Sequence, residues 1–147
     1  MYAIGLEQNQ EPSVLEGTFL VSNSRASILF DTGASNSFIS ATFVTALGLI
    51  ACKLDPPLSI QSALGSCVVL DKVCRECEIE IGNHHFVFDL IMMNMMIFDD
   101  ILGIDWLTTF QVTINYSRRR IFLAAINQGA VNIVLPLRKN GRDDLLN

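Results

Sequence analysis

The feature that most constrains this chain is an acidic residue between an apolar strand and a glycine turn. Asp31 follows the apolar run Ile28-Leu29-Phe30 and precedes Thr32-Gly33-Ala34-Ser35. Apolar β-branched and aromatic residues on both sides, with Phe38-Ile39 beyond, predict two short strands. Gly33 permits a tight reversal between them, where a Cβ would clash. Asp31 would then end a buried strand, where a free charge is costly unless the protein uses it.

Taken alone, Asp-Thr-Gly predicts an ordinary turn, because all three residues are turn formers. The surrounding sequence changes this interpretation, because a second block of apolar residues and a glycine leads into a helix at Asp100-Ile101-Leu102-Gly103-Ile104-Asp105-Trp106-Leu107. With these two blocks the sequence resembles the retropepsin-like aspartic proteases, whose active-site loop is an apolar pair followed by Asp-Thr-Gly-Ala or Asp-Ser-Gly-Ala. The ending Asp-Trp-Leu is most similar to proteases of gypsy-type long-terminal-repeat retrotransposons.

The resemblance implies an all-β fold with one or two short helices, namely a retropepsin-like barrel with one lobe per chain. We expect residues 1–13 to be an N-terminal lead-in, residues 14–124 to form the protease domain and residues 125–147 to be a polar tail or linker. The two blocks also suggest that a strand–turn–helix plan occurs twice in the chain.

The implied activity is that of an aspartic endopeptidase that works as a homodimer. In such enzymes two carboxylates share one proton, so that one activates water while the other assists the leaving nitrogen. This chain has one Asp-Thr-Gly and, at 147 residues, is too short for the bilobed form that has two. The second Asp31 would therefore come from another copy across a two-fold axis. The implied substrate is a retroelement polyprotein, and no cofactor and no metal are expected.

The resemblance also assigns roles to individual residues. Asp31 corresponds to the catalytic carboxylate, Thr32 to a threonine whose hydroxyl braces the two loops across the dimer, and Gly33 to the glycine that leaves room for substrate. Substrate contacts are implied for the loop, for the tip of a flap hairpin and for the second block, namely Ala34, Ser35, Ser62, Ala63, Leu64, Gly65, Ile101 and Leu102.

The flap is the stretch in which two extended arms flank a turn of small residues, Ser62-Ala63-Leu64-Gly65-Ser66. Without the family, this stretch predicts only a surface hairpin. Within the family it corresponds to the hairpin that closes over substrate. Its tip, Ala63-Leu64-Gly65, departs from the Ala-Asn-Gly that gypsy-type members often carry, but it keeps the glycine.

Composition excludes several other classes of function. Half of the residues are apolar, yet no run approaches the ~18 apolar residues of a membrane span. The net charge of −5 argues against nucleic-acid binding as the main role. The start, Met1-Tyr2-Ala3, lacks the basic residues and apolar core of a signal peptide, so we expect a cytoplasmic protein, or one inside virus-like particles.

The four cysteines, Cys52, Cys67, Cys74 and Cys77, include one pair with the two-residue gap of a zinc or redox site. A structural zinc site needs a second pair at matching spacing, and the sequence offers none. The alternation around Cys77 instead predicts a strand. We therefore expect reduced thiols and no metal.

Alternating polarity and turn residues predict the remaining elements. Ser40 predicts the N-cap, and Gly48 the C-terminal end, of a helix over residues 41–47. The predicted strands cover residues 17–21, 26–30, 38–39, 58–60, 67–70, 76–81, 85–90, 111–116 and 121–123, with a break at residues 55–57.

Two other functions stay open at this point. One is a domesticated or inactive retropepsin fold that serves as a dimerisation or peptide-binding module. The intact Asp-Thr-Gly-Ala argues against it, whereas the altered flap tip leaves it open. The other is an unrelated small β-barrel that binds an apolar ligand. Peptide cleavage that disappears in Asp31→Asn would separate the protease from both alternatives.

Overall fold

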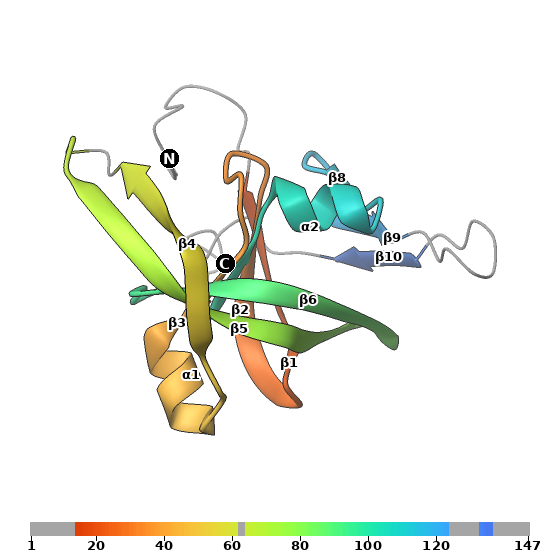
Figure 1. Cartoon of the computed structure of the whole chain (residues 1–147). Helices are drawn as coiled ribbons and strands as arrows, with labels where there is room; N and C mark the ends of the chain where they lie inside the picture. The colour runs from red at the N-terminus through yellow and green to blue at the C-terminus, as the bar shows by residue number, and fades with distance from the viewer. Residues whose placement is uncertain (1–13, 62–63, 124–132, 137–147) are drawn as a thin grey trace.

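The computed structural model describes residues 14–61, 64–123 and 133–136, which form strands and two short helices (Figure 1). The elements in chain order are β1 (Val14–Val21), β2 (Ser24–Asp31), β3 (Phe38–Ser40), α1 (Ala41–Leu47), β4 (Cys52–Gln61), β5 (Cys67–Ile81), β6 (His84–Met93), β7 (Asp100–Leu102), α2 (Ile104–Thr109), β8 (Thr113–Asn115), β9 (Arg120–Leu123) and β10 (Ile133–Pro136). The predicted all-β class is confirmed. Within this part of the chain, neither helix is long and apolar enough to cross a membrane.

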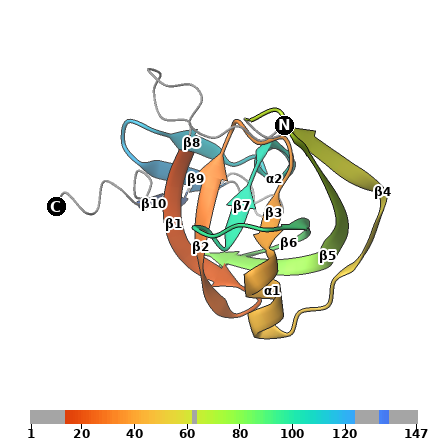
Figure 2. The same cartoon turned by 90° about the vertical axis from the view of Figure 1, so that its left-hand side faces the viewer.

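The main sheet has seven strands in the order β1-β2-β7-β3-β6-β5-β4. An additional antiparallel pairing of Leu20 and Val21 with β5 curls it back on itself (Figure 2). At its centre β7 pairs in parallel with β2, and β3 pairs in parallel with β6. An antiparallel contact between β3 and β7 joins these two pairs. The predicted repetition is therefore visible as β2–loop–β3–α1 and β6–loop–β7–α2.

Two groups of buried side chains lie on opposite faces of the central strands. The first, called the main core below, surrounds Trp106, which is fully buried and contacts the rings of Phe30 and Phe86 at centroid distances of 6.0 and 5.2 Å. The second, called the site cluster below, consists of Val14, Leu29, Ala34, Phe38, Leu70 and Ile101. Alternation along each strand produces this division, since successive side chains point to opposite faces.

The first hairpin and the first helix agree closely with the predictions made from the sequence. The predicted strands 17–21 and 26–30 lie inside β1 and β2, which are longer at the ends away from the turn. Ser40 caps α1, because its Oγ accepts a hydrogen bond from the Phe43 amide at 3.3 Å. Gly48 ends the helix in the left-handed conformation at φ 65°. These predictions are confirmed.

Three predictions about regular structure differ from what is observed. Residues 55–57 do not break the extended structure as predicted, because β4 continues through them. The strand lies at the edge of the main sheet, where proline's missing N–H costs no ladder bond, and only its register against β5 shifts, between Lys53 and Leu58. The segments 67–70 and 76–81 belong to one strand, β5, which bends at a bulge between Cys74 and Cys77. Lastly, β10 lies within the predicted tail and pairs with β9.

A buried carboxyl group in β7 generates the first testable prediction. Asp100 is fully buried, and its register partners are Ile28 of β2 and Ile39 of β3. Burial raises the pKa of Asp100 well above its usual value, the Ile101 amide partly offsets this rise, and Asp99 adds to it. The folded protein therefore keeps Asp100 protonated at pH values where the unfolded chain has lost that proton. The folded protein is then destabilised relative to the unfolded chain as the pH rises above the pKa that Asp100 has in the unfolded chain.

We expect Asp100→Asn to remove this destabilisation while keeping the side chain's shape. The difference in unfolding free energy between the variant and the wild type should grow with pH, by at most about 1.4 kcal/mol per pH unit. Urea unfolding at several pH values between 4.5 and 8 measures it. Asp71→Asn, at an exposed position of β5, is the matched control. Parallel pH dependences for wild type and Asp100→Asn would contradict the assignment.

Candidate functional site

The candidate site is the loop that follows β2, which lies between the β4–β5 hairpin and α2 (Figure 1). Asp31 is the last residue of β2 and is 1% exposed. Its Oδ1 accepts a hydrogen bond from the Gly33 amide at 2.8 Å, and its carbonyl accepts one from the Ala34 amide at 3.2 Å. The tight turn expected around Asp31 is thus present. The Gly33 N–H holds the carboxylate and stabilises negative charge on it.

The other loop residues divide between surface and interior. Thr32, Gly33 and Ser35 are exposed, whereas Ala34 is buried in the site cluster. The loop therefore presents a hydroxyl and an open stretch of backbone to the outside while Ala34 anchors it. The substrate contacts of Ala34 and Ser35 and the roles implied for Thr32 and Gly33 stay predictions.

The second sequence block lies directly behind this loop. The parallel pairing of β2 with β7 places Leu29 opposite Ile101 and Phe30 opposite Leu102. These two β7 residues, predicted to bind substrate, are only 2% and 0% exposed. In the single chain they support the loop from within, and their contact with substrate stays a prediction.

Gly103 fits where no other residue would. A Cβ built on Gly103 would overlap the carbonyl oxygens of Asn36 and Ala34. The same Ala34 carbonyl accepts a hydrogen bond from the Ile104 amide at 2.8 Å. The start of α2 therefore packs backbone to backbone against the loop of Asp31, and the missing side chain of Gly103 makes this approach possible.

Ser37 and Asp105 fasten the far end of the loop. The Ser37 hydroxyl donates to Asp105 Oδ1 at 2.6 Å, and the Ser37 amide donates to Oδ2 at 3.2 Å. The Ser37 Oγ in turn accepts from the Gly103 amide at 2.9 Å. Asp105 lies in the first turn of α2. The role of Ser37 was missed, because the two residues are 68 positions apart.

A second contact that the sequence did not reveal joins the loop to β8 and β9. The hydroxyl of Tyr116, which follows β8, donates to Thr32 Oγ1 at 3.3 Å. Both residues line a cavity of about 400 Å³ that extends between α2 and β8 and is also lined by Ile104, Leu107, Thr108, Gln111, Val112, Thr113 and Ile114. Burial raises the pKa of Tyr116, the hydrogen bond to Thr32 partly offsets this rise, and the charge of Asp31 adds to it.

The hairpin for which the flap role was predicted is present and consists of β4 and β5, whereas its role as a flap stays a prediction. Its base shares the site cluster with the loop, because Leu58, Ile60 and Leu70 pack there with Ala34 and Phe38. Toward the tip the apolar side chains face outward: Leu64 is 95% and Val69 is 62% exposed. Gly65 adopts a φ of 92°, which favours glycine. Ser62 and Ala63 lie outside the described residues.

The cysteines and histidines form no competing site in the part of the chain that the structure describes. No group of three or more metal-ligating side chains comes together there. All four cysteines are free thiols. Burial raises the pKa of Cys77 to about 11, although a hydrogen bond to Ser22 opposes this rise. His84 and His85 begin β6, directly after the β5–β6 turn.

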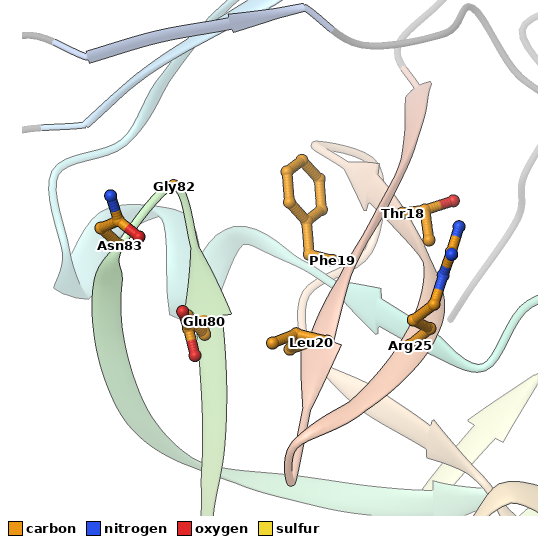
Figure 3. Close-up of a pocket in the computed structure, with 7 residues that line it drawn as sticks. All are labelled: Thr18, Phe19, Leu20, Arg25, Glu80, Gly82 and Asn83. Carbon is orange, nitrogen blue, oxygen red and sulfur yellow. The ribbon is translucent and has the colours of Figure 1, made fainter.

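A second cavity, of about 330 Å³, lies between the β1–β2 hairpin and the β5–β6 turn (Figure 3). It is lined by Thr18, Phe19, Leu20, Arg25, Glu80, Gly82 and Asn83. Along the β1–β2 ladder, Leu20 pairs with Arg25, whereas Val14 pairs with Asp31. Six residues of strand separate the two places, roughly 20 Å. This cavity is therefore remote from Asp31.

The close approach at Gly103 generates a prediction. Gly103→Ala should lower the unfolding free energy by about 1–3 kcal/mol, since the new methyl group overpacks against backbone that cannot move without shifting Asp31. Thermal or urea unfolding measures the effect. Thr108→Ala, at an exposed position of α2, is the control and should change stability by less than about 0.5 kcal/mol. Equal stability of Gly103→Ala and wild type would show that the loop and α2 are not in contact.

Comparison with known proteins agrees with this geometry. The sequence matches the family described as retroviral aspartyl protease over residues 1–129. The fold is similar to the retroviral protease-like domain of Ddi1 from Leishmania major, with a TM-score of 0.63 and 15% identity over 88% of this chain and 98% of that one. It is also similar to EIAV protease in complex with an inhibitor, with a TM-score of 0.54 and 17% identity over 74% and 96% of the two chains. Because the family match spans most of its length, this chain belongs to the retroviral aspartyl protease family.

Proposed function

We propose that this protein is an aspartic endopeptidase whose active site is completed by a second copy of the chain. The observation that carries the proposal is the placement of Asp31, a buried carboxylate held by the Gly33 amide beside the exposed residues Thr32 and Gly33. Aspartic proteases need two such carboxylates close enough to share a proton. Membership of the retroviral aspartyl protease family supports the same assignment.

The acidic residues of the second block are engaged elsewhere in the same chain. Asp99 accepts a hydrogen bond from the Ser27 amide at 2.9 Å. Asp100 is enclosed in the core, and Asp105 binds Ser37. We therefore assign the second carboxylate to Asp31 of another copy, related by a two-fold axis.

In the proposed mechanism one Asp31 is ionised and the other is protonated. The ionised carboxylate takes a proton from a water molecule, whose oxygen attacks the carbonyl carbon of the peptide bond. The protonated carboxyl donates a hydrogen bond to the carbonyl oxygen, where negative charge develops. The proton taken from water then passes to the leaving nitrogen, and the carbon–nitrogen bond breaks. The reaction consumes one water molecule and restores the shared proton.

The substrate that suits this surface is an extended peptide with apolar side chains. Exposed apolar residues occur on the flap, at Leu64 and Val69, and on the loop before β7, where Met96 is 97% and Ile97 is 79% exposed. That loop lies beside the site, because Met95 and Phe98 pack on the site cluster. An extended peptide can add main-chain hydrogen bonds to the edge of the flap while its side chains enter apolar pockets. We infer a retroelement polyprotein as the natural substrate, in a reducing intracellular compartment where the four thiols stay free.

Removing the carboxylate charge tests the catalytic role. Asp31→Asn should fold as the wild type does and should lose at least about 1000-fold in kcat on a peptide with an apolar junction, because an amide cannot act as the base. Glu78→Gln, on the exposed face of β5, is the control and should retain full activity. Cleavage by Asp31→Asn at the wild-type rate would refute the mechanism. A folded wild type without cleavage would favour a peptide-binding module.

Mixing wild type with Asp31→Asn tests whether two copies share one site. If subunits pair at random and each active site needs two carboxylates, an equal mixture at fixed total protein has about one quarter of the wild-type activity. A site contained in one chain would give about one half. The comparison is made after the subunits have exchanged, at a concentration where sedimentation shows dimers.

A further inference from the structure

Thr32 has a partner in its own chain that lies 84 residues away. Tyr116 begins the turn between β8 and β9, which the hydrogen bond from the Arg119 amide to the Tyr116 carbonyl closes at 3.2 Å. The ring is partly buried and packs against the main core. Its hydroxyl extends to Thr32 Oγ1. The tyrosine thus connects a packed part of the protein to the exposed residue next to Asp31.

The direction of this hydrogen bond matters for the loop. Tyr116 donates and Thr32 Oγ1 accepts, so the threonine's own O–H is directed away from Tyr116. A β-branched side chain already has few χ1 rotamers, and the contact with Tyr116 favours one of them. The hydroxyl of Thr32 is therefore oriented before any partner arrives, which reduces the entropy lost when it binds.

The surroundings of Tyr116 keep it in the donating form. Burial raises the pKa of its hydroxyl, the hydrogen bond to Thr32 partly offsets this rise, and the charge of Asp31 adds a smaller increase. The phenol consequently stays protonated at neutral and acidic pH. Its effect on Thr32 should not vary over the pH range in which two carboxylates can share a proton.

We propose that Tyr116 is a positioning residue of the protease, which orients Thr32 so that the Asp31 loops of two copies can meet. This inference rests on the proposed function, because it concerns the same loop and the same second copy. It assigns to the β8–β9 turn a role in assembling the active site, in addition to its packing on the core.

Tyr116→Phe tests the proposal, since it removes one hydroxyl and keeps the ring in the core. We expect unchanged thermal stability within about 0.5 kcal/mol, a dimer dissociation constant raised about two- to tenfold, and an unchanged KM for the peptide at saturating dimer. Ser117→Ala is the matched control. It removes a hydroxyl from the same turn, where Ser117 donates to Asn115 Oδ1 at 2.9 Å, and it should leave dimerisation unchanged.

A double-mutant cycle shows whether Tyr116 acts through Thr32. Thr32→Val replaces the hydroxyl with a methyl group of similar size, and the dimer dissociation constant is measured by sedimentation for Thr32→Val with and without Tyr116→Phe. If Tyr116 works through Thr32, its substitution has no further effect in the valine background. Equal effects in both backgrounds, or a Tyr116→Phe protein that dimerises as the wild type does, would overturn the proposal.

The outcomes also separate this inference from the proposed function. An active wild type whose Tyr116→Phe variant is unchanged overturns only the role of Tyr116. A wild type that dimerises without cleaving peptide, and whose dimer weakens in Tyr116→Phe, refutes the protease but supports the positioning role. A chain that neither dimerises nor cleaves overturns both.

Discussion

The rest of the site depends on the contact between the backbone at Gly103 and the loop that carries Asp31. No side chain fits between them, because a Cβ on Gly103 would overlap two loop carbonyls. Two hydrogen bonds form there: the Ile104 amide donates to the Ala34 carbonyl, and the Gly103 amide donates to Ser37 Oγ. Contacts of this kind cannot slide, since each hydrogen bond fixes register as well as distance. The parallel pairing of β2 with β7 continues the same alignment into the sheet.

This rigid support explains how the chain can hold an acidic group inside the fold. Asp31 and Asp100 are both buried, yet their environments differ. Asp100 lies between isoleucines of two central strands, where burial favours the neutral form. Asp31 receives a hydrogen bond from a backbone amide and adjoins exposed loop residues, so negative charge there is stabilised and near the surface. Of the two, only Asp31 is placed to act on another molecule.

The sequence predicted those parts of the fold that local pattern determines. Turn residues between two strand-like segments placed the first hairpin, and Ser40 and Gly48 bounded α1 correctly, because caps and turns depend on neighbouring residues. The two sequence blocks identified the loop and the glycine behind it. What the sequence did not reveal depends on contacts over long separations. Ser37 meets Asp105 over 68 residues and Tyr116 meets Thr32 over 84, and nothing local distinguishes these polar residues from surface ones. The prolines of β4 led to the wrong prediction of a break at residues 55–57 for a related reason. Prolines are tolerated in an edge strand, and only the sheet order shows that β4 lies at an edge.

The contacts that hold the Asp31 loop explain how a single chain can keep this loop ordered without a partner. Residues of the same chain bury Asp31, and the Gly33 amide of that chain donates a hydrogen bond to its carboxylate. Thr32 is likewise held by Tyr116, on the side of the loop that faces the cavity between α2 and β8. In the proposed dimer, each copy would bring an ordered loop to the two-fold axis, and association would not have to supply the free energy of ordering it. The second carboxylate would come from the other copy, and two acidic groups so close together are tolerated only when they share a proton. Dividing the pair between two chains would postpone that repulsion until the dimer forms, so that under this proposal assembly itself creates the catalytic group.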